Sequence, residues 1–241
     1  MLHALRGELA QLYTYYNVVF LLRALVVTFP LSAGGCLCGL VVGLALAVLR
    51  RTSRRSLLPV RLIVIAFVEL FRRIPFLVVL MLTFFVLQAL HVGVTLFVVA
   101  LTSCCISATA FIAEVIRGGL ESVHANQWDA AATINMSYLQ TVWLVILPQA
   151  WRVILPPAFS FFVLFIKDTA LASQIGVVEL TFAGTVLNNK GLSPELVFGT
   201  ILILYFVLSY PLARFGEWLE KHLAAARNRE PQGGLRQAGR A

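Results

Sequence analysis

Apolar stretches long enough to cross a bilayer set the strongest limit on what this chain can fold into. The longest runs from residue 21 to residue 49, whereas a helix needs about 20 predominantly apolar residues to span the hydrocarbon core. Sixty percent of the 241 residues are hydrophobic and only 12% are charged. Because a soluble domain needs a larger share of polar residues on its surface, the sequence predicts an all-α polytopic membrane protein.

The apolar stretches predict about five membrane crossings. Residues 57–71 are expected to lie along or enter the membrane at its cytoplasmic face, because Arg72 and Arg73 at the bilayer midplane would each cost at least ~2.5 kcal/mol. A single long helix kinked at Pro75 is the alternative. The expected crossings are 21–49, 74–90, 92–116, 138–166 (interrupted by Pro148, Pro156 and Pro157) and 196–212.

The basic residues predict the topology. The net charge is +8, but the positive residues gather after the first apolar stretch and in the tail, which favours a membrane protein over a nucleic-acid-binding one. With those segments inside, five crossings place the N-terminus outside. The expected parts are a periplasmic segment 1–19, a membrane domain 20–222 and a disordered basic cytoplasmic tail 223–241. The two groups are Arg50, Arg51, Arg54, Arg55 and Arg61, and Lys221, Arg227, Arg229, Arg236 and Arg240.

Small residues in the first apolar stretch indicate close helix packing. Gly35, Gly39 and Gly43 are spaced four apart and share one helix face, which allows another helix to approach within this subunit or from a second one. The four cysteines all lie inside apolar stretches. We interpret them as small buried hydrophobic residues and expect no metal site.

The polar connection at about 118–137 contains a short segment with its own helix signals. Asn126 is predicted to be the N-cap, with Asp129 at the third helical position, and Asn135 can adopt the left-handed conformation that ends a helix. Ser137 and Gln140 are expected to cap the following helix. Such a short cytoplasmic helix is either a lever for a soluble partner or a well-capped connector.

The same segment resembles the EAA signature of ABC importer permeases, which reads Glu-Ala-Ala, three residues, Gly, nine residues and Ile-x-Leu-Pro. The spacing is kept throughout, while Asp replaces Glu, Asn replaces Gly and Val replaces the first Ile. The matching residues are Asp129-Ala130-Ala131, Asn135 and Val145-Ile146-Leu147-Pro148.

Further segments resemble the polar-amino-acid permeases among these importers, over roughly residues 20 to 222. Residues 111–120 resemble an AEIxRGG segment, and 69–77 resemble an RGTPLL segment in which Arg73 replaces a residue that is usually Gly or Asn. Val79 stands where Gln is common. The later blocks are matched by Pro148-Gln149-Ala150, Pro156-Pro157 and Lys167-Asp168-Thr169-Ala170-Leu171.

The resemblance implies a type I importer permease in a bacterial inner membrane. An identical or homologous second permease would complete the pore, two ATPase subunits would sit beneath it, and a periplasmic amino-acid-binding protein would deliver the substrate. The chain itself would perform no covalent chemistry and hold no cofactor, since ATP and Mg belong to the ATPase. The residues implied to couple to the ATPase are Asn126, Gln127, Asp129, Ala130, Ala131, Asn135 and Pro148.

Ionisable residues within or beside the apolar stretches are candidates for a substrate path, because exposing them to lipid is costly. The alternatives are that Lys167 and Asp168 form structural pairs at a helix end and that Glu114 pairs with Arg117. The candidates are Arg73, Pro75, Glu114, Lys167, Asp168 and Glu179.

Other classes of function fit the sequence less well. The sequence contains neither G-x-S-x-G nor H-E-x-x-H, and its histidines (His3, His91, His124 and His222) are scattered, which argues against an intramembrane enzyme. An ion-coupled secondary carrier for amino acids and an ABC permease for another small solute stay open as alternatives. A structural scaffold would leave the capped loop unexplained.

Overall fold

A computed structural model describes residues 2–52 and 55–228, and this part of the chain contains helices and no strands. In chain order the helices are α1 (Leu2–Leu12), α2 (Tyr15–Arg51), η1 (Arg55–Leu57), α3 (Leu58–Phe71), α4 (Phe76–Ala89), α5 (Leu96–Glu121), α6 (Ala125–Thr133), α7 (Tyr138–Gln140), η2 (Thr141–Ile146), α8 (Leu147–Asp168), η3 (Thr169–Ile175), α9 (Leu180–Asn189) and α10 (Pro194–Asn228). Of these, η1 and η3 are 3-10 helices and η2 is a π-helix.

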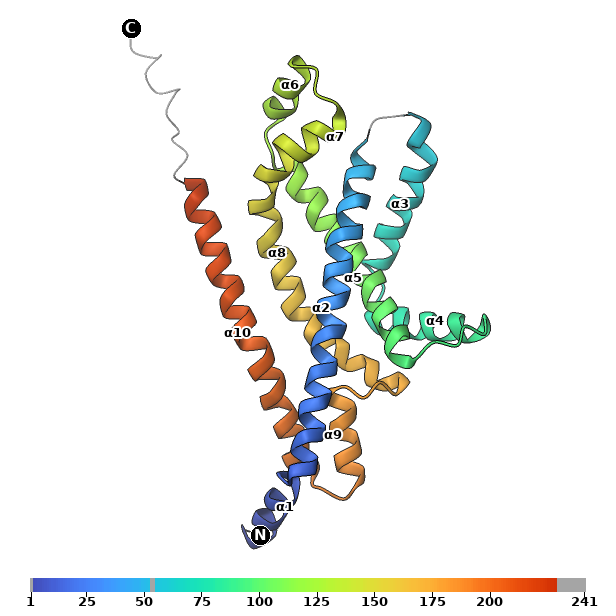
Figure 1. The fold of residues 1–241 in the computed structure, drawn as a ribbon, viewed down its shortest axis with the longest axis vertical. Coiled ribbons are helices and arrows are strands. Elements are labelled where there is room, and N and C mark those ends of the chain that lie inside the picture. Colours follow the sequence, from blue (N-terminus) through green and yellow to red (C-terminus); the bar gives the residue numbers. More distant parts are fainter. Residues whose placement is uncertain (1, 53–54, 229–241) are drawn as a thin grey trace.

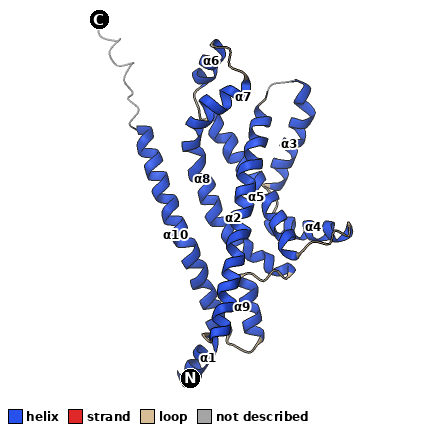
Figure 2. Cartoon of the chain, in the orientation of Figure 1, coloured by secondary structure: helices blue, strands red, loops and turns tan. Residues whose placement is uncertain are grey.

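The long helices confirm the predicted polytopic membrane fold. Four helical segments are long and apolar enough to span a membrane, and the bent pair formed by η1–α3 and α4 would make a fifth. In Figure 1, α2 runs along most of the length of the molecule, with α5, α8 and α10 beside it. The N-terminal helix α1 and α9 lie at one end, and α6 and α7 lie at the other. Figure 2 shows the same all-helical arrangement.

The helix α2 packs most extensively on α5, and its glycine face makes this possible. A Cβ atom at Gly35 would lie 2.8 Å from Cβ of Cys104, and one at Gly39 would lie 2.9 Å from the backbone of Ala108. One at Gly43 would lie 3.0 Å from the backbone nitrogen of Ala113. The ridge of small residues therefore serves packing within the subunit, which the sequence had left open.

The chain bends before Pro75, where the kinked alternative placed its kink, but α3 and α4 are two separate helices instead of one long one. Helix α3 stands beside α2 and α5, while α4 turns away from it by 116° (Figure 1). The break spans Arg72 to Pro75. Proline lacks a backbone N–H and excludes the preceding residue from helical geometry, and Pro75 has an extended ψ of 139°.

Several helical segments extend beyond the apolar runs that predicted them. Helix α2 begins at Tyr15, and its Arg23 is exposed, because a helix needs apolar residues only on the faces that meet lipid or protein. Helix α8 continues through Pro156 and Pro157, so these prolines do not interrupt the span as predicted. Membrane helices tolerate such residues where neighbouring groups satisfy the freed carbonyls. The tail predicted to begin at 223 is helical as far as Asn228, and residues 229–241 lie outside the described part.

Candidate functional site

The short helix α6 stands at one end of the molecule, between α5 and α7 (Figure 1). It begins at Ala125, with His124 at the N-cap position and no side-chain capping bond. The predicted capping roles of Asn126 and Asp129 are therefore wrong. The helix starts earlier than predicted, because His124 adopts the extended conformation (φ −56°, ψ 138°) that an N-cap requires and alanine readily follows it.

The other end of α6 closes as the sequence predicts. Asn135 has φ of 55°, in the left-handed region, and its N–H donates to the carbonyl of Ala132 at 3.0 Å. The N–H of Met136 donates to the carbonyl of Ala131 at 3.1 Å, which completes a Schellman motif. Ser137 and Gln140 then form the predicted reciprocal capping box of α7.

One face of α6 is held against the body of the protein and the other is open. Ala131 is buried, and the Trp128 side chain is partly buried in the main hydrophobic cluster. Gln149, one residue after Pro148 in α8, donates through Nε2 to Oε1 of Gln127 at 3.3 Å. Asn126, Gln127, Asp129, Ala130 and Ala132 are exposed, so the helix presents a low, weakly polar surface.

Three aromatic and basic side chains connect α6 to the end of α2. The guanidinium carbon of Arg51 lies 4.3 Å from the centroid of the Trp128 ring, which is cation–π geometry. The Trp128 and Tyr138 rings stack with centroids 6.3 Å apart and planes inclined by 21°. The Tyr138 hydroxyl donates to the carbonyl of Val48 at 2.8 Å. No local sequence signal indicates this group, because Arg51 lies far from Trp128 and Tyr138 in the chain.

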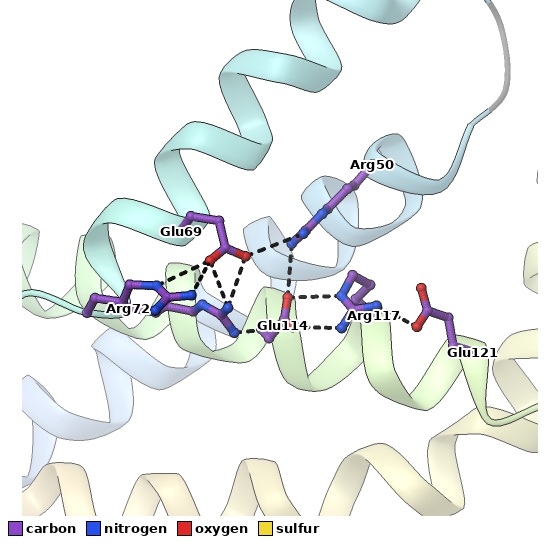
Figure 3. A network of polar contacts seen from close by, with 7 residues as sticks. Arg50, Glu69, Arg72, Glu114, Arg117 and Glu121 are labelled. Carbon is purple, nitrogen blue, oxygen red and sulfur yellow. Dashed lines mark hydrogen bonds and ion pairs between the residues drawn. The ribbon is translucent and has the colours of Figure 1, made fainter.

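A network of ion pairs joins the C-terminal parts of α2, α3 and α5 (Figure 3). Glu114 of α5 is at its centre. Its carboxylate lies 2.9 Å from Nη1 of Arg50, 3.2 Å from Nη1 of Arg72 and 2.7 Å from Nη2 of Arg117. The predicted pairing of Glu114 with Arg117 is therefore confirmed, but within a larger group that joins three helices.

A second carboxylate extends the network to the break between α3 and α4. Oε2 of Glu69 lies 2.8 Å from Nη2 of Arg72 and 2.9 Å from Nη2 of Arg73, and Oε1 lies 3.5 Å from Nη2 of Arg50. Arg73 is the most exposed member, with 71% of its side chain accessible. The ion-pair network therefore includes residues on both sides of the end of α3, where the chain turns toward Pro75.

The other substrate-path candidates lie apart from this network. Lys167 and Asp168 are exposed at the end of α8, and the described residues contain no ion pair between them. Lys167 lines a groove of about 560 Å³ between α8 and α10. Its neighbours in that groove include Tyr205, Phe206 and Tyr210.

Glu179 is fully buried and caps α9. Its carboxylate accepts hydrogen bonds from the backbone N–H groups of Thr181 and Phe182 and from the hydroxyl of Tyr205, at 3.0, 2.8 and 2.8 Å. Burial raises the pKa of Glu179, and these hydrogen bonds oppose the rise. The residue thus holds α9 against α10, within a buried cluster near the N-terminal end of α2.

Membrane helices joined by a docked and capped surface helix define a transport subunit of the importer-permease type, and comparisons with known proteins agree. The family of inner membrane components of binding-protein-dependent transport systems matches residues 39–225. The chain belongs to this family and is a multi-pass inner-membrane component of an ABC transport system.

Individual relatives cover most of the chain. It is 29% identical over 212 residues to the probable glutamine ABC transporter permease protein GlnP of Bacillus subtilis (strain 168), across 86% of this chain and 95% of that one. It is 32% identical over 197 residues to the L-cystine transport system permease protein TcyB of the same organism, across 81% and 83%. A solved amino acid ABC transporter with histidines matches with a TM-score of 0.77 at 25% identity, over 86% of this chain and 95% of that one.

Proposed function

We propose that this chain moves polar amino acids inward across the inner membrane, driven by ATP that a separate ATPase subunit hydrolyses. A periplasmic binding protein would deliver the amino acid, and a second permease subunit would complete the pore. The membrane helices would then alternate between inward-facing and outward-facing arrangements. The single observation that carries the proposal is α6, a short helix between two membrane spans with one face packed on the protein and the other exposed.

The surface of α6 suits a soluble partner better than it suits lipid. Its exposed residues are alanines, two amides, Asp129 and Thr133, and a row of alanines allows close approach by another surface. The helix is fixed from beneath by Ala131 and Trp128 and at its end by Asn135. A force applied to Asp129, Ala130 and their neighbours would therefore pass into the protein instead of bending a loose loop. Pro148 would act indirectly, because it sits at the start of α8 beneath α6.

The choice of amino acids as substrates rests on the relatives. The curated names include permeases for glutamine, L-cystine and glutamate from different bacteria. All three are zwitterions at neutral pH, so a path for them needs both a positive and a negative group. Lys167 and Asp168 supply both charges side by side at the end of α8.

Of the six path candidates, we favour Lys167 and Asp168. The carboxylate of Glu114 is engaged by three arginines, that of Glu179 by the start of α9, and Arg73 by Glu69. Pro75 shapes the turn before α4. Lys167 and Asp168 keep their side chains exposed, which leaves them able to meet the two charges of an amino acid.

The positions of α1 and α6 at opposite ends of the molecule support an orientation with the N-terminus in the periplasm. The helix α1 lies at the end of the molecule opposite α6, and α10 runs toward the end that carries α6 (Figure 1). If α6 faces the cytoplasm, the basic residues Arg50 and Arg51 at the end of α2 lie on the same side, in agreement with the positive-inside rule.

The test is uptake into proteoliposomes that contain this permease with its ATPase and binding protein. Labelled glutamate, glutamine, arginine and histidine are compared with ATP and with a nonhydrolysable analogue inside. We expect uptake of at least one of them with ATP and none with the analogue. Uptake that persists without ATP would identify an ion-coupled carrier, and ATP-driven uptake of a different solute would overturn the amino-acid assignment alone.

A further inference from the structure

The two arginines that end α2 point to different parts of the protein. Arg50 reaches the ion-pair network through Glu114 and Glu69, whereas Arg51 lies over the ring of Trp128 in α6. Adjacent residues of an α-helix are rotated by about 100° from each other, so one helix end can hold two partners. The end of α2 is therefore connected both to α6 and to the junction of α3 and α5.

Tyr138 strengthens the connection to α6 through the backbone of α2. The last carbonyls of a helix have no intrahelical donor, and Val48 O is one of these because the N–H of Thr52 donates to Leu49 instead. The Tyr138 hydroxyl supplies the missing donor at 2.8 Å. Its ring stacks on Trp128, so these side chains join α6 and α7 to the last turn of α2.

From this geometry we infer that Arg51, Trp128 and Tyr138 are positioning residues that pass the displacement of α6 to α2. The inference rests on the proposed function, in which an ATPase pushes on α6. We call the three residues the aromatic clamp. The clamp lies on the side of α6 away from the exposed Asp129 and Ala130, so it would contribute to transmission without touching the ATPase.

The packing of α2 determines where the displacement goes next. The glycine face of α2 brings its backbone close to α5. A Cβ atom added at Gly35, Gly39 or Gly43 would lie only 2.8 to 3.0 Å from the nearest atom of α5. Two helices packed this closely move together, because no side chain lies between them to yield. A push on α6 would therefore move α2 and α5 as a pair, together with the ion-pair network at their ends.

The same contacts would also exist in a clamp that only supports α6. A support and a transmitter differ in one measurable quantity, the number of amino-acid molecules imported per ATP hydrolysed. Loss of a support lowers ATPase assembly, hydrolysis and transport together. Loss of a transmitter lowers transport while the ATPase still binds and hydrolyses ATP.

The experiment measures this ratio in reconstituted complexes of the full permease with its ATPase and binding protein. The variants are Arg51→Ala, Trp128→Ala, their double mutant and Tyr138→Phe, which removes one hydroxyl and keeps the ring. Arg51→Lys retains the cation. Arg55→Ala is the matched control, since it removes an exposed arginine of η1, close to Arg51 in the sequence.

We expect Arg51→Ala and Trp128→Ala each to lower the import ratio by about threefold or more, the factor typical of losing a partly exposed cation–π contact. The double mutant should be no lower than the worse single mutant, because both remove the same interaction. Arg51→Lys should recover most of the ratio, Tyr138→Phe should lower it by a smaller factor, and Arg55→Ala should match the wild type.

Two results would overturn the inference alone: single mutants with the wild-type import ratio, or single effects that multiply in the double mutant. Tyr138→Phe keeps the test decisive if the alanine variants fail to assemble, since a wild-type ratio in that variant would remove the Val48 contact from the pathway. A wild-type complex that imports nothing with ATP would instead overturn the proposed function, and the inference with it.

Discussion

At the scale of single residues, the glycines of α2 show how closely this helix packs on α5. A methyl group at Gly39 would lie 2.9 Å from a backbone carbon of Ala108, which cannot move aside as a flexible side chain could. We predict that Gly39→Ala destabilises the folded protein by about 1–3 kcal/mol. The midpoint of thermal unfolding in detergent should fall.

Gly118 in α5 is the matched control, because a methyl group there would meet nothing within 4 Å. Gly118→Ala should keep or raise the unfolding midpoint, since alanine favours helix over glycine by about 1 kcal/mol. Equal midpoints for the two variants would contradict the close approach of α2 to α5.

Glu114 is the residue on which the ion-pair network depends. Its side chain is 22% exposed and faces three arginines, so Glu114→Gln would leave three guanidinium groups with weaker partners. We predict a loss of about 2 kcal/mol in unfolding free energy, less than for a fully buried pair because water reaches this site. Glu121→Gln, whose side chain is 49% exposed and pairs with Arg117, should cost much less. Chemical denaturation of the two purified variants would separate these outcomes.

Lys167 tests the proposed substrate path at the same scale. We predict that Lys167→Ala lowers ATP-driven uptake by about tenfold while the ATPase remains bound, because the substrate carboxylate loses its cation in an apolar groove. Lys190→Ala, at the end of α9, should leave uptake unchanged. Normal uptake by the Lys167 variant would remove this residue from the path.

At the scale of elements, α6 depends on how it ends. Asn135 holds a φ of 55°, where a β-branched residue costs about 1–2 kcal/mol and glycine costs nothing. We predict that Asn135→Val unwinds the end of α6 and weakens copurification with the ATPase. Asn135→Gly should bind the ATPase as the wild type does, so equal binding by both variants would show that the helix end is unimportant.

The elements also show which features a sequence can predict. Local signals were sufficient for the capping box at Ser137 and the left-handed residue at Asn135, because both depend on neighbours within a few positions. The start of α6 was misplaced, because a helix can begin without a side-chain cap. The sequence indicates a bend at Pro75 but not the angle of 116° between α3 and α4, since a proline interrupts a helix without fixing the angle.

The candidate site also contains both features that local sequence signals predict and features that they do not. The EAA-like spacing and the exposure of Asp129 and Ala130 follow from one continuous segment. The aromatic clamp joins residues of α2, α6 and α7, and the ion-pair network joins α2, α3 and α5. Such groups arise only when the chain folds. The basic pair Arg50 and Arg51 at the end of α2 is a local signal, but it indicates only the cytoplasmic side and not the partners of the two side chains.

At the scale of the whole molecule, the helices form a body with different ends. One end carries α6 and α7, and the other carries α1 and the capped helix α9 (Figure 1). Helix α2 runs between these two ends and packs on α5 through its glycine face (Figure 1). A subunit built in this way can turn a push at one end into a rearrangement of its membrane helices, which is the central claim of the account.

The most direct test of that claim is the initial rate of ATP-driven uptake in complexes that carry Asp129→Lys. Asp129 is exposed and its capping role is excluded, so reversing its charge should disturb the ATPase contact without unfolding the permease. We predict that uptake falls by about tenfold or more, with an unchanged unfolding midpoint. Wild-type uptake by this variant would contradict the claim that α6 receives the ATPase.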